Sequence, residues 1–404
     1  MTKPPQLPRL LAAPGPGLAD HQLQFGPLPE VVGPELVESL ERAGLTGRGG
    51  AGFPSARKVA AVSGLKSVVV GNGAEGEPLS RKDAALLNRA PHLVLDGLAA
   101  AAAAVEADQV YLYVHSDAVP AVTHALAERR AAGLDQVEVA LVEAPDRFVA
   151  GEESAAIRRI EGGPALPRDR TVMTAISGVR RRPTLVNNVE TLGHIALIAR
   201  FGPGWFRSVG DQGDPGSMLI TLSGALTNTG VIEVPTGALL TSLIERHGAT
   251  DPRTVRAVLV GGYHGSWIPA KALAGHGFSR PGLKALDASP GAGVIHALGV
   301  GECGLARTAE IATYLAEQSA GQCGPCRNGL PHLEQLLHDL AYTRVSDSLI
   351  KEIRRILRLV EGRGSCRHPD GTTRMIRSAL RTFATDIEHH RHLSCEAAAV
   401  SHPV

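Results

Sequence analysis

The sequence has few aromatic residues, which make up 3% of its 404 positions. Phe, Tyr and Trp normally supply large buried surfaces, so Ala, Val and Leu must build most of this core. The apolar fraction of 44% and the charged fraction of 20% are ordinary for a soluble globular protein. The length predicts two or three domains.

The chain also lacks charge of one sign and a long apolar run. Its formal net charge is +1, which excludes a large electrostatic field that would attract nucleic acid or an anionic membrane. The most apolar stretch, residues 93–107, is mostly alanine and contains Asp96, so it predicts a buried helix rather than a membrane span. Prolines interrupt residues 1–17 where a secretory signal needs an apolar core. We therefore expect a cytoplasmic protein.

The sequence has few cysteines, and they are odd in number. The five cysteines are Cys303, Cys323, Cys326, Cys366 and Cys395. An odd number in a long chain without an export signal argues against a disulfide framework and favours metal binding or catalysis.

The pattern of apolar residues divides the chain into three predicted domains. Residues 1–215 begin with an irregular lead-in and then alternate helices with strands near 66–72, 108–115 and 137–144, which predicts an α/β domain with a largely parallel sheet. Residues 216–300 predict a small α+β unit resembling a β-grasp. Residues 301–404 carry four stretches with helical spacing, which predict a bundle that holds all the cysteines.

A glycine loop at residues 47–52 satisfies the pattern G-x-G-x-x-G. A helical stretch precedes it, whereas the dinucleotide fingerprint requires a strand there. Consecutive glycines can nevertheless present backbone N–H groups to a phosphate, and Arg48 and Lys58 add positive charge. The alternative is a tight turn between two helices.

Residues 323–326 form a C-x-x-C motif, which is either a redox dithiol or half of a metal site. A thioredoxin-like dithiol follows a strand in a βαβ unit, but helical stretches flank this motif. In a reducing compartment such a motif is more often metal-binding or catalytic.

Five segments carry a family resemblance. They are GRGGAGFPSARK (47–58), GNGAEGEP (71–78), GEESAAIRRIEG (151–162), RRPTLVNNVETL (181–192) and SAGQCGPCR (319–327). In order and spacing they resemble the flavoprotein subunit of NADH:quinone oxidoreductase (respiratory complex I) and related subunits of NAD-linked hydrogenases and formate dehydrogenases. The resemblance extends from about residue 35 to the C-terminus.

The resemblance implies that one cavity binds FMN and NADH and passes electrons to a [4Fe–4S] cluster. It implies four groups of flavin-site residues. They are Gly47, Arg48, Gly49, Gly50 and Lys58 on the phosphate side, Asn72, Glu75 and Gly76 against the flavin, Gly151, Glu152 and Glu153 along the isoalloxazine and nicotinamide, and Asn187, Asn188 and Thr191 closing the site.

The NADH side matches the family less well. Phe53 and Glu77 match family positions, and Arg170 replaces a lysine. Ala61 and Met173 stand where the family carries aromatics, and Ala74 stands where an aspartate is usual. We expect FMN binding to be kept, and NADH binding to be weakened or replaced by another donor.

The cluster motif keeps its frame but has lost one ligand, since Ala320 stands at the first cysteine of the family motif. The resemblance leaves Cys323, Cys326 and Cys366 as iron ligands. The site then holds a [4Fe–4S] cluster with a non-cysteine ligand, a [3Fe–4S] cluster, or no cluster. Cys303 is a candidate for the missing ligand.

The last helical stretch ends in a small group of histidines. Cys395 and His389, His390 and His392 predict a solvated helix end, with a metal site as the alternative.

The resemblance implies an FMN-dependent oxidoreductase that passes electrons from NADH, or another two-electron donor, to an iron–sulfur acceptor. The expected partner is a small iron–sulfur protein, either a ferredoxin or a thioredoxin-like [2Fe–2S] subunit, in a multi-subunit redox complex. Two alternatives remain. One is a non-catalytic subunit with a structural or binding role, and the other is an enzyme with a different donor, such as reduced ferredoxin or NADPH.

Overall fold

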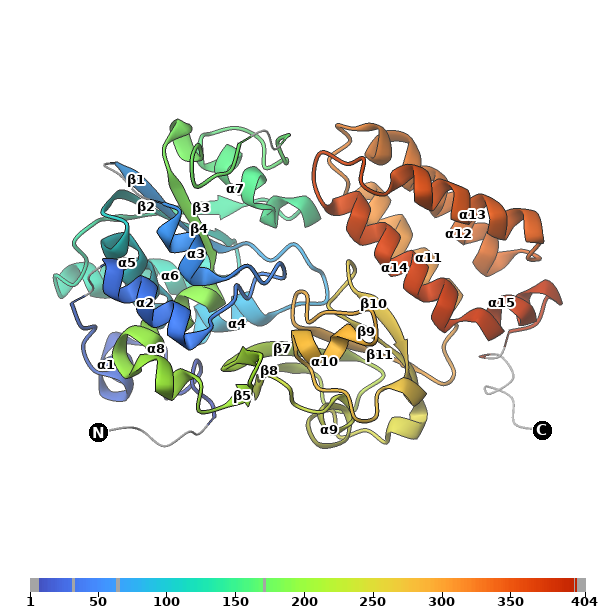
Figure 1. Cartoon of the computed structure of the whole chain (residues 1–404), viewed down its shortest axis with the longest axis horizontal. Helices are drawn as coiled ribbons and strands as arrows, with labels where there is room; N and C mark the ends of the chain where they lie inside the picture. Colours follow the sequence, from blue (N-terminus) through green and yellow to red (C-terminus); the bar gives the residue numbers. More distant parts are fainter. Residues whose placement is uncertain (1–6, 31–32, 63–65, 170–171, 396, 398–404) are drawn as a thin grey trace.

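The computed structural model describes residues 7–30, 33–62, 66–169, 172–395 and 397. Three parts follow one another along the chain (Figure 1). An α/β part lies with the N-terminus at the left, a second sheet lies low in the middle, and a group of helices with the C-terminus lies at the right. Within the described residues no helix has the length and apolarity needed to cross a membrane.

The α/β part is built on a four-stranded sheet in the order β3-β2-β1-β4. Its strands are β1 (Ser67–Gly73), β2 (Ala107–His115), β3 (Val139–Ala144) and β4 (Thr184–Asn188). All three strand pairs are parallel, as the alternation of strands and helices predicted. The carboxyl ends of β1 and β4 are neighbours in the register, which pairs Asn72 with Asn188.

Helices cover both faces of this sheet. They are α1 (Leu18–Phe25), α2 (Gly33–Ala43), α3 (Ser55–Ala60), α4 (Lys82–Arg89), α5 (Pro91–Ala104), α6 (Val119–Ala131), α7 (Glu153–Ile160) and α8 (Val189–Phe206). The alanine-rich stretch forms α5 and is buried, as predicted. It packs so closely on α8 that a Cβ atom at Gly97 would overlap the backbone carbonyl of Leu192. Because small side chains allow this close packing, the core needs few aromatic residues.

The middle part contains a five-stranded sheet in the order β10-β9-β11-β7-β8. Its strands are β7 (Ser217–Gly224), β8 (Gly230–Pro235), β9 (Val255–Val260), β10 (Ser266–Pro269) and β11 (Val294–Gly299), with the short helices α9 (Leu240–Ser242) and α10 (Arg280–Lys284) beside them. β11 pairs with β7 in parallel, and the other pairs are antiparallel. The short strands β5 (Gly210–Asp211) and β6 (Asp214–Pro215) lead into it.

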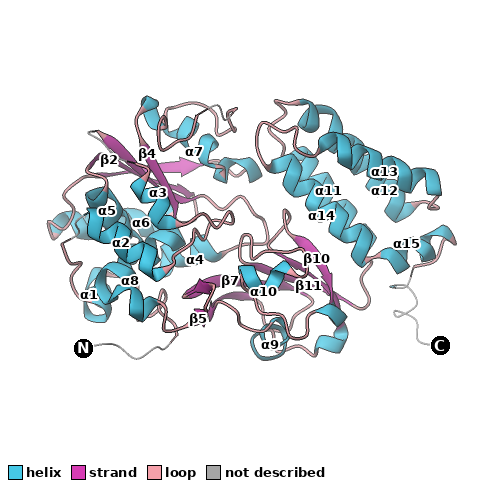
Figure 2. Ribbon diagram, viewed as in Figure 1, coloured by secondary structure: helices cyan, strands magenta, loops and turns pink. Residues whose placement is uncertain are grey.

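The C-terminal part is helical (Figure 2). Its helices are α11 (Gly304–Glu317), α12 (Leu330–Tyr342), α13 (Asp347–Val360), α14 (His368–Thr382) and α15 (Ala384–Arg391). Apolar residues at helical spacing, such as Ile350, Ile353 and Leu357 on α13, face the core of this part.

The last predicted helix is broken in two. Phe383 leaves the helical conformation between α14 and α15, with φ −104° and ψ 29°. Its ring is buried against Trp267, with ring centroids 5.3 Å apart. It also occupies the space beside Gly304, where a Cβ atom would overlap the ring. This packing places α15 near the start of α11.

Candidate functional site

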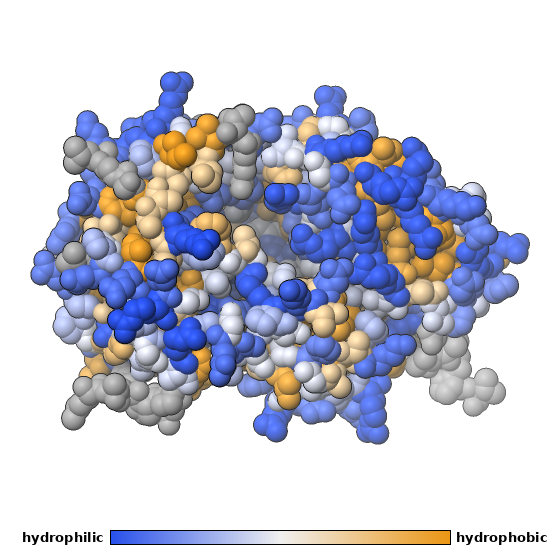
Figure 3. Space-filling view, viewed as in Figure 1, coloured by the Kyte–Doolittle hydropathy of each residue, from blue (hydrophilic) through white to orange (hydrophobic). Residues whose placement is uncertain are grey.

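A cavity of about 260 Å³ lies at the carboxyl ends of β1 and β4. Parallel α/β sheets usually bind ligands at this edge. Nine of the predicted site residues line it: Gly49, Asn72, Glu75, Gly76, Glu77, Gly151, Glu152, Asn188 and Cys366. Figure 3 shows this face of the molecule hollowed near its middle, between the α/β part and the helical part.

Two loops of this cavity fit closely together. The Asn72 side-chain amide donates to the carbonyl of Gly151 at 2.9 Å. A Cβ atom at Gly76 would overlap the carbonyl oxygen of Phe148, and one at Gly151 would overlap that of Ala74. Glycine is thus required at both positions by the approach of one backbone to another.

The end of β4 joins the glycine loop to the same cavity. Asn188 caps α8 by accepting from the N–H of Glu190 at 3.0 Å, and its amide donates to Asp83 at 2.6 Å. A Cβ atom at Gly49 would lie 3.1 Å from that of Asn188, so the loop rests on this side chain.

The structure places Arg48 differently from the prediction. Its buried guanidinium donates to Asp214 at 3.0 Å and to the carbonyl of Pro215 at 3.0 Å, and it does not line the cavity. Its backbone N–H donates to the hydroxyl of Thr191 at 2.9 Å. The expected phosphate-side charge at Arg48 is therefore used to attach the glycine loop to the segment that leads into the middle part.

The remaining predicted flavin residues lie around the cavity but outside its wall. Gly47 donates to the carbonyl of Phe53 at 2.9 Å and closes the glycine loop, in which Gly50 takes φ +103°. Lys58 pairs with Glu153 at 3.2 Å. Asn187 is buried, and its side-chain nitrogen has no hydrogen-bond partner among the described residues.

A buried charged cluster forms the floor of the cavity. Lys82 lies 2.6 Å from Asp83 and 3.1 Å from Glu190. Burial opposes the charge of Lys82, but these two carboxylates raise its pKa above the ordinary value. Burial and the neighbouring Asp83 raise the pKa of Glu75 to about 8. Sequence reasoning missed the three charged residues of this floor, because a lysine–aspartate pair at a helix start resembles a solvated turn.

Glu77 connects the α/β part with the middle part. Its carboxylate accepts from the backbone N–H of Tyr263 at 2.7 Å and from that of Leu79 at 3.2 Å. Burial raises its pKa to about 7 despite these hydrogen bonds. Both carboxylate oxygens are thus engaged with protein backbone, although Glu77 lines the cavity.

The raised pKa of Glu77 predicts a pH-dependent stability. A carboxyl whose pKa rises from 4.5 in the unfolded chain to about 7 in the folded chain contributes stability below pH 4.5 that is lost as the pH rises through 7. At about 1.4 kcal/mol per unit, we expect this group to lower the free energy of unfolding by about 1–3 kcal/mol between pH 5 and 8. Urea unfolding at several pH values measures this free energy, which should fall less with rising pH in Glu77→Gln than in the wild type.

The control for this measurement is Glu138→Gln, since the Glu138 side chain is 79% exposed. It should keep the wild-type pH dependence. Equal slopes for wild type and Glu77→Gln would contradict the shifted pKa.

An aromatic wall closes the cavity on the side of the helical part. Phe148 packs edge-on against His264 with ring centroids 4.6 Å apart, and against His368 at 5.3 Å. His368 also contacts the carbonyl of Leu315 through Nε2 at 2.8 Å. Burial lowers the pKa of both histidines, which keeps this wall uncharged. No sequence motif links these three residues, which come from three different parts of the chain.

Of the predicted NADH residues, only Glu77 is found in the wall of the cavity among those that the structure describes. Phe53 is 52% exposed and lies outside the wall. Arg170 lies outside the described residues. Ala61 and Met173, at the positions of the family aromatics, are exposed, whereas Ala74 is buried and lines the cavity.

Three cysteines lie together beside this cavity. Cys326, at the start of a helical turn (Pro325–Gly329) before α12, is buried, and its neighbours include Cys323 and Cys366. Burial, and then these two thiols, raise the pKa of Cys326 to about 12. Cys366 also lines the cavity.

The structure holds Cys303 away from Ala320, the position of the missing fourth ligand. It precedes α11, whereas Ala320 follows α11, and a 14-residue helix is about 21 Å long. Cys303 instead contacts His390. The prediction of a solvated helix end is wrong for His390, which is buried.

The residues of the cavity fit a flavin, and the cysteines fit an iron–sulfur cluster. The second amide hydrogen of Asn72 and the glycine-loop backbone offer hydrogen-bond donors, and the aromatic wall offers apolar surface, as small-molecule sites require. Three adjacent thiols suffice for a three-iron cluster, whereas a four-iron cluster requires one further ligand.

A second and larger cavity, of about 770 Å³, contains none of the predicted site residues. It lies at the amino ends of β2 and β3, beside α1 and α5. Since α/β sheets bind ligands at the carboxyl ends, we take the smaller cavity as the functional site despite its volume.

Two family models match the chain. The Nuo51 FMN-binding domain matches residues 40–197, and the NADH-ubiquinone oxidoreductase-F iron-sulfur binding region matches residues 306–390. The first match contains the glycine loop and both strand ends of the cavity, and the second contains the three neighbouring cysteines.

Curated proteins match over most of the chain. The F 2 subunit of NADH-quinone oxidoreductase from Rhizobium meliloti (strain 1021) is 30% identical over 373 residues, which cover 88% of each chain. The F subunit of NADH-quinone oxidoreductase from Escherichia coli (strain K12) is 29% identical, covering 88% of this chain and 84% of its own. The HndC subunit of the NADP-reducing hydrogenase from Solidesulfovibrio fructosivorans is 29% identical, covering 88% and 76%.

A solved structure shares the fold. In the crystal structure of the H₂-reduced NAD⁺-reducing [NiFe]-hydrogenase, one chain superposes with a TM-score of 0.79 at 29% identity. The match covers 88% of the present chain but only 62% of the hydrogenase chain. The two family models cover the glycine loop, the paired strand ends and the clustered cysteines, and the Rhizobium relative is 30% identical over 88% of both sequences. The chain therefore belongs to the family of NADH-quinone oxidoreductase F subunits.

Proposed function

We propose that this chain is an FMN-dependent electron-transfer oxidoreductase that takes electrons from NADH, or from another two-electron donor, and delivers them to an iron–sulfur acceptor. The observation that supports this most is a single cavity that touches the glycine loop at Gly49, the strand ends at Asn72 and Asn188, and the iron–sulfur region at Cys366. The flavin site and the cysteines share one wall, as direct electron transfer between their groups requires.

FMN, when bound, supplies the chemistry that accepts a hydride and releases electrons singly. In this proposal Gly49 and its loop hold the phosphate side through backbone N–H groups. Asn72 orients the flavin through its second amide hydrogen, and Asn188 supports the glycine loop beside it. Glu152 stays fixed because its carboxylate caps α7, accepting from the N–H of Ser154 at 2.8 Å. Phe148 and the histidine pair exclude water on the opposite side.

The three cysteines are the proposed iron ligands. Cys323, Cys326 and Cys366 would hold a cluster beside the flavin cavity, with Ala320 leaving one iron position without a thiolate. The proposed partner is a small iron–sulfur protein in a cytoplasmic multi-subunit complex. We also propose the domain boundaries 1–215, 216–300 and 301–404, with a β-grasp unit in the middle.

A non-catalytic role is the second candidate. Ala61, Met173 and Ala320 stand at family positions for stacking or iron ligation, and Phe53 lies outside the cavity wall. A protein retained only for assembly would show these losses.

Reconstitution with FMN separates the two candidates. The purified chain is loaded with FMN under anaerobic conditions and titrated with NADH, while flavin absorbance and reduction of an artificial acceptor are followed. We expect stoichiometric flavin and bleaching only at high NADH concentration. A protein that takes up no FMN would refute the enzyme proposal, and full bleaching at low NADH would refute weakened donor binding.

A further inference from the structure

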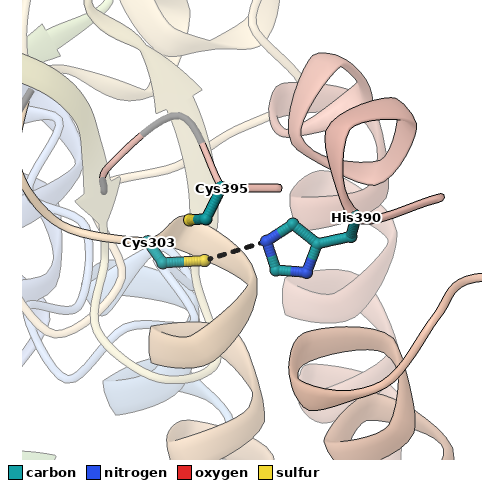
Figure 4. Close-up of side chains that lie close together, drawn as sticks. All are labelled: Cys303, His390 and Cys395. Carbon is teal, nitrogen blue, oxygen red and sulfur yellow. Dashed lines mark hydrogen bonds between the residues drawn. The ribbon is translucent and has the colours of Figure 1, made fainter. Parts of the chain in front are cut away.

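A second cluster of metal-binding side chains lies away from the flavin cavity. Figure 4 shows the Cys303 side chain directed towards the imidazole of His390, with Cys395 close by. The distance from Cys303 Sγ to His390 Nε2 is 3.6 Å, and the three ligand atoms all lie within 4.8 Å of one another. Two soft sulfur ligands and one imidazole form the kind of set that proteins use for zinc.

Three separate features of the fold bring these residues together. Cys303 is the residue that caps α11, but its side chain makes no capping hydrogen bond. The break at Phe383 turns α15, with His390, towards that helix start. After α15 the chain folds back through hydrogen bonds from Leu393 to His390 and from Ser394 to His389, which places Cys395 beside both.

The spacing of Cys303 and His390 agrees with tetrahedral coordination. Zinc binds sulfur at about 2.3 Å and imidazole nitrogen at about 2.0–2.1 Å, so a tetrahedral ion holds its sulfur and nitrogen ligands about 3.6 Å apart. The observed 3.6 Å between Cys303 Sγ and His390 Nε2 therefore needs no rearrangement.

We propose that Cys303, His390 and Cys395 bind one Zn²⁺ ion. His390 is buried and the two cysteines are half-buried, so water can take the fourth position. The ion joins the start of α11 to the end of α15 and to the segment that follows it. Because α11 separates this cluster from Ala320 by about 21 Å, the zinc site is independent of the proposed iron–sulfur site and of the flavin.

The test measures zinc and iron in the same samples. Full-length protein, purified under reducing conditions without chelator, is analysed by elemental mass spectrometry, and the apoprotein is titrated with Zn²⁺ against a chromophoric chelator. We expect one zinc per chain in the wild type. Removing an outer partner of a zinc ligand already weakens binding by about 10- to 100-fold, so Cys303→Ser, His390→Gln and Cys395→Ser should each weaken it by more than that.

These variants should fold, and a matched control exists. Serine is a preferred residue at the start of a helix, so Cys303→Ser keeps α11. His389→Gln changes the neighbouring histidine, which lies outside the cluster, and should bind zinc like the wild type. Replacing Zn²⁺ with Co²⁺ should give thiolate charge-transfer and tetrahedral d–d absorption that disappear in Cys303→Ser.

Three results would overturn the proposal. They are a wild type that binds no more zinc than Cys303→Ser, equal zinc loss in His389→Gln, and a parallel wild-type preparation without reductant in which mass measurement finds Cys303 joined to Cys395 as a disulfide. Loss of iron together with zinc in Cys395→Ser would also contradict two independent sites.

Discussion

The variant Gly76→Ala is expected to lose about 10- to 100-fold in FMN affinity while remaining folded. Its new Cβ atom would overlap the backbone carbonyl of Phe148, closer than 3.0 Å, a separation that real Cβ atoms essentially never show. Backbone cannot move aside as a side chain does, so the loop after β1 must separate from the loop at residues 148–151. Both loops line the flavin cavity.

The magnitude follows from the cost of overpacking. Such substitutions cost about 1–3 kcal/mol, and each 1.4 kcal/mol is a factor of about ten in affinity. Gly151→Ala should lose FMN affinity to a similar extent, since its Cβ atom would overlap the carbonyl of Ala74 across the same contact. The affinity is measured by quenching of FMN fluorescence on titration with apoprotein.

The matched control is Gly204→Ala. A Cβ atom there has no neighbour within 4 Å, and Gly204 lies near the end of α8, away from the cavity wall. It should bind FMN like the wild type, and circular dichroism should show all three variants folded. Wild-type FMN affinity in Gly76→Ala would show that the flavin does not occupy the cavity between these loops.

The second large effect is expected at the cysteines. Cys326→Ser should lose most of the iron of the anaerobically purified protein, because it removes the most buried of only three thiolates. Iron is quantified chemically, and the cluster is followed by anaerobic EPR spectroscopy. Ala320→Cys should instead raise the iron content per chain, since it restores the fourth thiolate that a cuboidal cluster uses.

Cys303→Ser is the specificity control for the iron measurement. It also removes a half-buried thiol, but from the zinc cluster, so the iron content should stay at the wild-type value while zinc is lost. Unchanged iron in Cys326→Ser, or iron-free wild type after anaerobic purification, would contradict an iron–sulfur site at these cysteines.

The flavin cavity illustrates how far local sequence reasoning extends. The family resemblance of the glycine loop, the two asparagine-bearing segments and the GEE loop implied a shared site. The structure places Gly49, Asn72, Glu152 and Asn188 there. Arg48 departs from the prediction because its partner, Asp214, lies 166 residues later.

The sequence did not predict the charged floor or the aromatic wall of the cavity. Lys82 and Glu190 meet only because α4 and α8 start at the same sheet edge. Phe148, His264 and His368 belong to three parts of the chain and carry no common motif. Such contacts depend on tertiary packing, which spacing along the sequence does not encode.

Apolar periodicity predicted the α/β sheet and the helical C-terminal part, and the family resemblance implied that Ala320 stands in place of one cysteine ligand, because these properties are local or depend on residue identity. The surroundings of Cys303, by contrast, depend on how the helices pack. A 14-residue helix holds it about 21 Å from Ala320, and the break at Phe383 directs His390 to it instead. The distance between two cysteines is set by the rigid helix between them and by what that helix packs against, which a residue count cannot supply.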